Sequence, residues 1–357
     1  MKKVKASAPG KILFLGGYSV LEQICSALVL SVGARVRVQV TPRKDNLIVL
    51  KAKGFGEERG EIKGSKVFWK REPKLVFLKS VVENCFAFGR ASGLSAGGFD
   101  LTARNDKEFG KPSEKSGLGS SAAVTVAAAG AILHSMGCSD VDAIHKIAQY
   151  SHSIAQGRVG SGFDVAAACF GSCVYQRFSP RLVEENGVVA ASDAEWDFVV
   201  QKPALPQLFL SFASFKKSSA STPLLVKKVF ALKEKNSQLY WDLVNELNQI
   251  NLRALNASSI HDWNAFKAFV DEGRRVTSIL CDKACAVFEP PEARALIDAA
   301  YSSGAIACKL PGAGGLDAIA ALSTSLEAKK RIDAAWKKNK ALKVMAVSIE
   351  EKGLEIE

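Results

Sequence analysis

The clearest chemical signal in the sequence is a run of glycines and serines, Lys115-Ser116-Gly117-Leu118-Gly119-Ser120-Ser121-Ala122. It leads into an alanine- and valine-rich stretch, residues 124–133, which predicts a buried helix. Glycine lets a backbone turn tightly and approach a ligand closely, and the start of a helix carries unpaired N–H groups and partial positive charge. A structural turn capped by serine is the alternative. The whole cluster favours a phosphate-binding loop, with a cation from Lys115 and hydroxyls from Ser120 and Ser121 for phosphate oxygens or a metal ion.

Two more glycine loops follow. The first, Arg158-Val159-Gly160-Ser161-Gly162-Phe163-Asp164, presents Asp164 at the start of a small apolar helix. Aspartate is also an ordinary residue at a helix start, but the loop also brings an arginine, a serine and two glycines, which favours a functional role. The second, Leu310-Pro311-Gly312-Ala313-Gly314-Gly315-Leu316-Asp317, connects two predicted strands. By itself it would also be compatible with a hairpin turn that binds nothing.

A lysine lies at the start of the first predicted strand. Pro9-Gly10-Lys11 precedes the apolar residues 12–15, and Gly16-Gly17 then breaks the strand. This position would aim the ammonium group of Lys11 into a site.

Composition indicates a globular protein of two domains. The chain has 357 residues, of which 48% are hydrophobic and 24% are charged, and this length exceeds the usual size of one domain. No apolar run is long enough to span a bilayer, and the basic N-terminus lacks the apolar core of a secretory signal. We therefore expect a cytoplasmic protein with no membrane partner.

The charge distribution and the cysteine spacing indicate which ligands to expect. The formal net charge of +12 comes from lysines and arginines spread along the chain. Because they form no basic stripe with interleaved aromatics, anionic small substrates are favoured over nucleic acid. Two cysteine pairs, Cys169/Cys173 and Cys281/Cys285, differ from the usual zinc spacing and have no histidine beside them, so reduced thiols are expected. The histidines are expected to be structural; they are His134, His145, His152 and His261.

Hydrophobic periodicity predicts a mixture of strands and helices. In the first half we expect a half-buried strand over 34–40, with residues 46–51 as its hairpin partner, and helices over 75–88 and 141–155. We expect a loop over 53–66, in which Gly54-Phe55-Gly56 binds no ligand. In the second half we expect a strand over 208–213, helices over 224–232, 237–255, 262–280, 291–302 and 326–338, and a final strand over 342–349. The character of the sequence changes at residues 189–206, which places a domain boundary there. The mixed second half is consistent with a ferredoxin-like α+β unit.

Three of these motifs, in this order, resemble the GHMP kinase superfamily, which includes galactokinase, homoserine kinase, mevalonate kinase and phosphomevalonate kinase. They are residues 9–22, 115–123 and 310–317, and the resemblance spans nearly the whole chain. It implies an α+β, two-domain GHMP kinase fold. The N-terminal, ATP-binding domain would be ribosomal protein S5 domain 2-like and cover residues 1–200, and the C-terminal domain would be ferredoxin-like and cover residues 201–357.

Within the superfamily, three segments are similar to the eukaryotic-type phosphomevalonate kinases: residues 155–168, Tyr175-Gln176-Arg177-Phe178 and residues 221–229. This similarity implies transfer of the γ-phosphoryl group of ATP, with Mg²⁺, to phosphomevalonate, which yields diphosphomevalonate. One departure is Leu316, which stands where that branch usually carries a further glycine.

The resemblance also implies roles for individual residues. Lys11 and Asp164 would be catalytic. The ATP phosphates would contact Lys115, Ser116, Gly117, Leu118, Gly119, Ser120, Ser121 and Ala122, with Ser120 or Ser121 holding Mg²⁺. The acceptor would contact Lys11, Tyr18, Arg158, Ser161, Gly162, Ser221, Thr222, Gly314, Gly315 and Asp317. Because a phosphate acceptor is mostly ionised at neutral pH, we expect Lys11 to bridge donor and acceptor, and Asp164 to orient Lys11 or the metal as much as to remove a proton.

Other functions remain open at this point. The chain could be a mevalonate kinase or another small-molecule kinase of the superfamily. It could also be a non-catalytic sensor with the same fold, although such a protein would be expected to lose Lys11 or Asp164. A dinucleotide-binding enzyme is disfavoured because polar residues 111–116, and not a strand, precede the first glycine loop. We expect a monomer or a homodimer.

Overall fold

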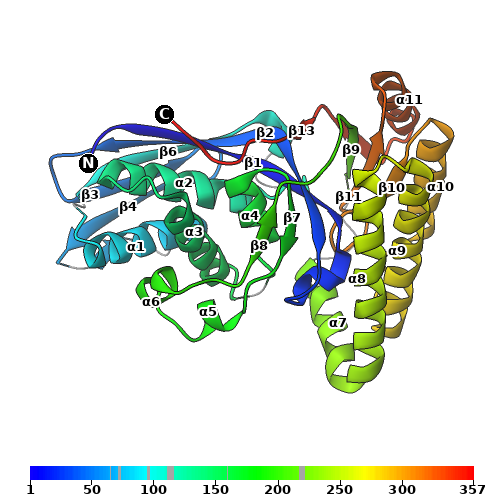
Figure 1. Ribbon diagram of the computed structural model, residues 1–357. Coiled ribbons are helices and arrows are strands. Elements are labelled where there is room, and N and C mark those ends of the chain that lie inside the picture. Colours follow the sequence, from blue (N-terminus) through cyan, green and yellow to red (C-terminus); the bar gives the residue numbers. More distant parts are fainter. Residues whose placement is uncertain (65, 71–73, 95–96, 111–115, 159, 217–221) are drawn as a thin grey trace.

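The computed structural model describes residues 1–357 except residues 65, 71–73, 95–96, 111–115, 159 and 217–221. One domain is built on a ten-stranded sheet and the other on a four-stranded sheet, and the two lie side by side (Figure 1). The predicted two-domain α+β fold is confirmed. Among the described residues, no helix is long and apolar enough to cross a bilayer, and the eight cysteines are free thiols.

The first sheet has the strand order β14-β1-β2-β6-β3-β4-β5, and three further strands extend it, because β13 and β7 pair with β2, and β8 pairs with β7. The described pairings are antiparallel except for β3 with β6. The strands are β1 (Val4–Leu15), β2 (Ala27–Pro42), β3 (Leu47–Ala52), β4 (Gly56–Lys63), β5 (Lys66–Trp69), β6 (Phe99–Asn105), β7 (Cys173–Gln176), β8 (Val199–Gln201), β13 (Ile349–Glu350) and β14 (Glu355–Ile356). The helices of this domain are η1 (Gly17–Leu21), α1 (Val76–Ala91), η2 (Lys107–Phe109), α2 (Ser120–Met136), α3 (Val141–Ala155), α4 (Phe163–Phe170), α5 (Arg181–Glu184) and α6 (Val188–Asp193).

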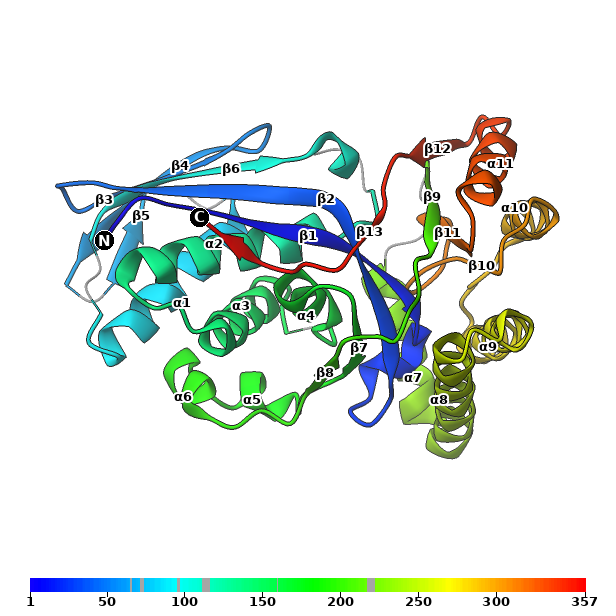
Figure 2. The ribbon, with the colours of Figure 1, turned by 45° about the horizontal axis from the view of Figure 1, so that its top comes forward.

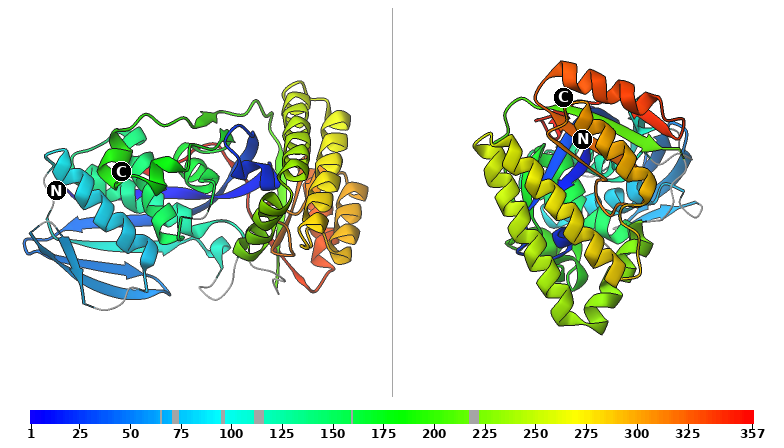
Figure 3. Two further views of the ribbon diagram at one scale, coloured as in Figure 1. Left: turned by 90° about the horizontal axis from the view of Figure 1, so that it is seen from below. Right: turned by 90° about the vertical axis from the view of Figure 1, so that its right-hand side faces the viewer.

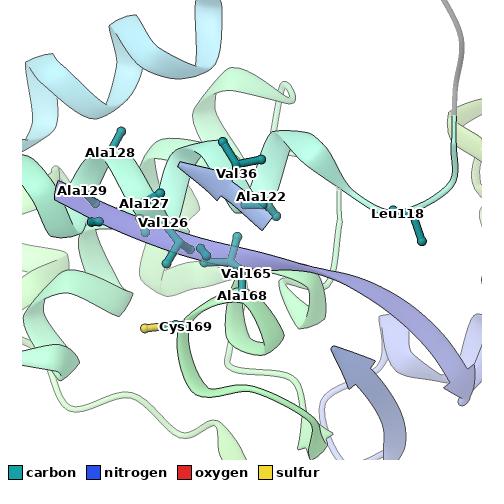
Figure 4. Close-up of a cluster of buried hydrophobic side chains, with 14 of the residues drawn as sticks. Val36, Leu118, Ala122, Val126, Ala127, Ala128, Ala129, Val165, Ala168 and Cys169 are labelled. Carbon is teal, nitrogen blue, oxygen red and sulfur yellow. The ribbon is translucent and has the colours of Figure 1, made fainter. Parts of the chain in front are cut away.

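Helix α2 lies at the centre of the first domain. It packs on β1 and β2, and α1, α3 and α4 cover its other sides. Its side chains are small enough to be buried all round, as Figure 4 shows for Ala122, Val126 and Ala129 next to Val165 of α4. The helix ends at Gly137, as the sequence predicts, with a left-handed φ of 105°. Burial on all sides fixes the start of α2, where the first glycine loop enters.

The second domain has the ferredoxin-like strand order. Its antiparallel sheet runs β10-β11-β9-β12, and its strands are β9 (Phe209–Phe215), β10 (Ala307–Lys309), β11 (Ala318–Ser323) and β12 (Leu342–Met345). Its helices are α7 (Thr222–Lys235), α8 (Ser237–Ser259), α9 (Trp263–Lys283), α10 (Pro291–Ser302) and α11 (Leu326–Lys337). Strand β11 is buried on both faces, since Ala320 and Leu322 point to one core and Ile319 and Ala321 to the other. This explains its continuous apolar sequence.

Three expectations about strands in the sequence are wrong. Residues 46–51 do not form a hairpin with residues 34–40, because β6 lies between β2 and β3. The loop expected over 53–66 contains β4, which pairs with β3. The final strand expected over 342–349 is two strands in different sheets, β12 and β13. In the first and third cases the strand partner comes from a distant part of the chain, which local periodicity does not encode; in the second, the polar and glycine-rich composition of residues 53–66 concealed a strand next to its partner.

The C-terminal segment returns to the first domain. Figure 2 shows it running beside β1 (red against dark blue), and β13 and β14 pair with β2 and β1. The guanidinium of Arg35 donates to the carbonyls of Gly353 at 2.5 Å and Ser7 at 2.9 Å, and Arg35 is 6% exposed. The division at residues 200 and 201 therefore assigns to the second domain a segment that completes the first sheet.

The two domains are also joined at η1. Glu22, just after η1, accepts from Lys233 of α7 and from the hydroxyl of Tyr240 of α8, each at 2.7 Å. Figure 3 shows the long helices of the second domain standing beside this end of the first domain. These contacts fix the position of the second domain relative to β1, which carries Lys11.

Two glycines let the C-terminal segment cross the end of α4. A Cβ on Gly353 would lie 2.1 Å from the carbonyl oxygen of Cys169, and a Cβ on Gly171 would lie 1.9 Å from that of Glu351. We predict that Gly353→Ala destabilises the protein by at least about 2 kcal/mol, because two backbones would have to separate in a close-packed region. Urea unfolding measures this. Gly187→Ala, where a Cβ meets nothing within 4 Å, is the control, and equal stability of the two variants would contradict the prediction.

His145 of α3 makes stability depend on pH. The residue is 1% exposed, and neither ring nitrogen has a hydrogen-bond partner in the described part of the chain. The ring centres of Phe170 and Phe198 lie 4.8 and 4.7 Å from that of His145. Burial lowers its pKa to about 4; the nearby Asp142 opposes this shift and Lys146 adds to it. The unfolded chain binds a proton near pH 6.5, so stability is full above that pH and falls as the pH decreases toward 4.

We predict that lowering the pH from 7 to 5.5 costs the wild type about 1 kcal/mol more than it costs His145→Phe. Urea unfolding of both at the two pH values checks this. The exposed His261 provides the control His261→Gln, which should follow the wild type. An identical pH dependence of the wild type and His145→Phe would refute the assignment.

Candidate active site

The end of β1 and the three glycine loops meet at the border between the domains. The backbone N–H of Lys11 donates to the carbonyl of Leu118 at 2.8 Å, and that of Gly312 donates to the carbonyl of Leu13 at 3.3 Å. The first loop also touches the second domain, because a Cβ on Gly117 would lie 3.4 Å from the Cβ of Ala318. Residues more than 300 positions apart in the sequence thus form one surface.

Lys11 lies across the first glycine loop. Its Nζ donates to the carbonyl of Gly117 at 3.3 Å and lies 5.4 Å from the ring centre of Phe163. A Cβ on Gly119 would come within 2.8 Å of Cε of Lys11, and Gly119 has a left-handed φ of 74°. Gly119 is therefore needed for two reasons: its backbone conformation and the space that Lys11 occupies.

The carboxylates of Asp164 and Asp317 act on the charge of Lys11. Burial lowers the pKa of its ammonium group, whereas Asp164 and Asp317 raise it. The three side chains come from β1, from α4 and from the third glycine loop. A partly desolvated cation flanked by anions is poised to interact strongly with an additional phosphate.

Asp164 is fixed at the first turn of α4. Gly162 caps this helix in a left-handed conformation with φ of 82°, and a Cβ on it would lie 2.4 Å from the amide nitrogen of Gln149. One carboxylate oxygen of Asp164 accepts from the N–H of Val165 at 3.0 Å, and the side chain is 18% exposed. The carboxylate therefore has a defined direction and remains accessible.

His152 of α3 lies between the first loop and Asp164. Its Nε2 is 3.2 Å from the hydroxyl oxygen of Ser121 and 3.8 Å from a carboxylate oxygen of Asp164. Its ring stacks on Phe77 with centroids 5.2 Å apart. Burial and the nearby Lys11 lower its pKa, while Asp164 opposes this effect.

Some residues of the predicted phosphate loop can face a ligand only through their backbone, and others can do so through their side chains. The side chains of Leu118 and Ala122 are fully buried in the core, so only their backbone can face a ligand. The hydroxyl of Ser116 accepts from the N–H of Leu118 at 3.4 Å. Ser120 and Ser121 are the first two residues of α2 and line a cleft. Lys115 lies outside the described residues.

The third glycine loop is held by both domains. The hydroxyl of Tyr18 donates to the carbonyl of Ala313 at 3.1 Å, and the N–H of Gly315 donates to the carbonyl of Phe288 at 3.0 Å. A Cβ on Gly314 would collide with Phe288 at 2.4 Å. Tyr18 is only 1% exposed, which places it behind the loop.

Leu316 adopts a conformation that normally requires glycine. Its φ is 54°, which follows positive φ values of 78° at Gly314 and 73° at Gly315. A left-handed leucine costs roughly 1–2 kcal/mol. Leu316 packs at the edge of the second-domain core. The loop thus keeps the left-handed path that a further glycine would allow, at the cost of local strain.

A second group of predicted residues surrounds a polar pocket beside Asp164. The pocket is lined by residues of the second glycine loop and of α3, among them Arg158, Gly162 and His152. The guanidinium of Arg158 donates to the carbonyl of Glu184 at 2.9 Å. Ser161 is 3% exposed, and its hydroxyl has no hydrogen-bond partner among the residues that the structure describes. Ser221 lies outside the described residues, and Thr222 begins α7.

An open cleft of about 600 Å³ leads away from Ser120 and Ser121. Its walls come from the start of α1, from β3 and β6 and from the turn after β3. Phe55 and Phe77 contribute apolar surface, and Lys53, Lys74 and Asn105 contribute polar groups. Phe55, from the segment for which the sequence predicts no ligand, lines this cleft.

Sequence reasoning missed two parts of the site. The cleft combines residues from positions 52 to 124, and apart from Ser120 and Ser121 none of its lining residues belongs to a motif. His152 does carry a weak signal, because it follows Ile144 and Ala148 at helical spacing and so lies on the apolar face of α3. A histidine on such a face is usually structural, and only the fold shows that this one faces Ser121 and Asp164.

Comparisons with known proteins agree with this architecture. A phosphomevalonate kinase of Saccharolobus solfataricus is 29% identical over 358 residues and aligns with 99% of each chain. One of Candida albicans is 28% identical and aligns with 88% of each chain. The crystal structure of Streptococcus pneumoniae phosphomevalonate kinase in complex with phosphomevalonate and AMPPNP has the same fold, with a TM-score of 0.79, 19% identity and coverage of 98% of this chain and all of that one.

Two family models match the two domains separately. The model of the GHMP kinase N-terminal domain matches residues 77–172, which include the first two glycine loops. The model of the GHMP kinase C-terminal domain matches residues 251–342, which include the third. Since these two models describe the two halves of one kinase fold and together match more than half of the chain, the protein belongs to the GHMP kinase family.

Proposed function

We propose that the chain is a phosphomevalonate kinase, which transfers the γ-phosphoryl group of ATP to phosphomevalonate in the mevalonate pathway of isoprenoid and sterol synthesis. The observation that carries phosphoryl transfer is the position of Lys11, bonded to the carbonyl of Gly117 and flanked by Asp164 and Asp317. Phosphomevalonate is supported as the acceptor because the relatives that match most or all of the chain are phosphomevalonate kinases.

The donor would occupy the first glycine loop and the cleft beside it. The N–H groups at the start of α2 would face the ATP phosphates. The apolar walls formed by Phe55 and Phe77 would receive the base, with Lys53, Lys74 and Asn105 available to its polar groups. This arrangement directs the terminal phosphate toward Lys11.

The oxygens around His152 suit Mg²⁺. This ion prefers oxygen ligands and usually combines one or two protein groups with substrate phosphates. The hydroxyl of Ser121 and the carboxylate of Asp164 lie within 3.8 Å of the same ring nitrogen, and Ser120 is adjacent. These residues would hold the ion, which when bound supplies positive charge to the phosphates.

Lys11 would bring two polyanions together. The acceptor phosphate is mostly ionised at neutral pH, so the reaction needs charge neutralisation and alignment more than a strong base. The ammonium group of Lys11 would bridge the γ-phosphate and the acceptor phosphate. Asp164 would keep this ammonium group charged and directed, and the third loop, with Asp317, would close the acceptor side near Arg158, Ser161 and Thr222.

Two broader properties belong to the same proposal. We place the protein in the cytoplasm, which the free cysteines support because a reducing compartment keeps thiols unpaired. We also propose that it acts as a monomer or homodimer.

The acceptor can be tested directly. We predict that ADP release depends on phosphomevalonate, with kcat/KM at least about 100-fold higher than for mevalonate, because the acceptor phosphate adds two or more charge-assisted hydrogen bonds. A coupled ADP assay with phosphomevalonate, mevalonate, homoserine and galactose measures this. Preference for another acceptor would assign the chain to a different small-molecule kinase, and no turnover with any of them would support a sensor.

Removing the two central charges should abolish most activity. We predict that Lys11→Met lowers kcat roughly 100- to 1000-fold, as loss of one transition-state cation does, and that Asp164→Asn lowers it at least about 100-fold. Steady-state kinetics measures both. Lys5→Met, at an exposed position on the same strand, should retain wild-type rates. Full activity of Lys11→Met would exclude the bridging role, and wild-type behaviour of Asp164→Asn would show that the acceptor side is misplaced.

A further inference from the structure

One ring nitrogen connects the two halves of the site. Nε2 of His152 lies 3.2 Å from the hydroxyl oxygen of Ser121, on the donor side, and 3.8 Å from the carboxylate of Asp164, on the acceptor side. Ser121 belongs to α2, His152 to α3 and Asp164 to α4.

The imidazole ring is held rigidly. It is 2% exposed, and it stacks on Phe77 with an angle of 28° between the ring planes. Its backbone carbonyl accepts from the N–H of Gln156 at 3.0 Å, which keeps this end of α3 helical. A side chain confined in this way can impose an orientation on a neighbour.

The serine hydroxyl is the group that needs orientation. A hydroxyl is a rotor that can both donate and accept, so Nε2 can bond to it in either neutral tautomer of the ring. Once the hydroxyl is bonded to His152, the remaining electron pair of its oxygen has a defined direction. Because phosphoryl transfer depends on the alignment of donor and acceptor, this direction matters for the proposed reaction.

We propose that His152 is a positioning residue, which holds the Ser121 hydroxyl and the Asp164 carboxylate in fixed positions relative to each other. This arrangement aligns the donor with the acceptor. This role rests on the proposed phosphoryl transfer. His152 carries no proton in the reaction and touches no reacting atom. The four histidines were expected to be structural, and for His152 the inference replaces that role with one in the site.

Kinetics of two variants separate positioning from packing. His152→Phe keeps the aromatic stack on Phe77 but removes Nε2, and His152→Gln returns a polar group at a similar reach. We expect His152→Phe to lower kcat about 10- to 100-fold with the KM for the acceptor changed less than about threefold, as loss of such a supporting contact does. We expect His152→Gln to recover most of the loss. Equal kcat for the wild type and His152→Phe would overturn the proposal, and so would equal losses in both variants.

A double-mutant cycle tests the link to Ser121. If His152 acts through this hydroxyl, Ser121→Ala should lower kcat less than about twofold in the His152→Phe background, whereas Ser120→Ala should act by the same factor in both backgrounds. Ser120 is the matched control because it neighbours Ser121 on α2 but is not the serine bonded to His152. Independent effects of Ser121→Ala and His152→Phe would overturn the proposal. If His152→Phe does not fold, the cycle is run with His152→Leu.

A binding measurement keeps this inference separate from the identity of the acceptor. Calorimetry with AMPPNP, with and without Mg²⁺, requires no turnover. We expect the gain in affinity from Mg²⁺ to fall at least about threefold in His152→Phe and to return in His152→Gln, and an unchanged gain would overturn the proposal. If the wild type phosphorylates no acceptor, the proposed function fails, while this measurement still decides the role of His152.

Discussion

The site depends on one partly desolvated positive charge. The side chain of Lys11 crosses the first glycine loop and bonds to the carbonyl of Gly117, and the carboxylates of Asp164 and Asp317 favour its charged form. Desolvating an ammonium group is costly unless anions or ligands compensate for the lost water. Three separate segments must therefore meet at this point. Much of the fold, including the all-round burial of α2, the glycine at position 119 and the domain contacts at η1, serves to keep them together.

The small residues around this charge are a steric requirement. Gly119 leaves room for the Lys11 side chain, Gly162 for Gln149 and Gly314 for Phe288. Each of these glycines also has positive φ. A larger residue would therefore be disfavoured both by the contact of its Cβ and by its backbone conformation. Leu316 shows the limit of this rule, since its loop takes a left-handed path without a glycine. The site accepts that strain because neighbouring contacts on both sides of the loop, from Tyr18 and Phe288, hold the backbone in place.

The second domain acts on the site through a few contacts. Tyr18 and Leu13 bond to the third loop, Glu22 bonds to α7 and α8, and the C-terminal segment is clamped by Arg35 on the first sheet. Consequently the acceptor side cannot move independently of β1. In a kinase that must bring two phosphates together, this coupling lets closure over one substrate align the other.

The sequence by itself determined the long helices and the motifs. Residues 141–155, 237–255 and 291–302 have helical periodicity, and α3, α8 and α10 form there, because amphipathic helices are encoded locally. Glycine loops next to helix starts are likewise local signals, so Lys11, Ser121 and Asp164 could be chosen before any fold was known. Strand partners, the return of residues 349–356 to the first sheet, the cleft at Phe55 and the place of His152 were decided only by the tertiary structure. Each of these depends on which distant segments share a sheet edge or a helix face, and that is set by the packing of the whole core, which no local pattern encodes.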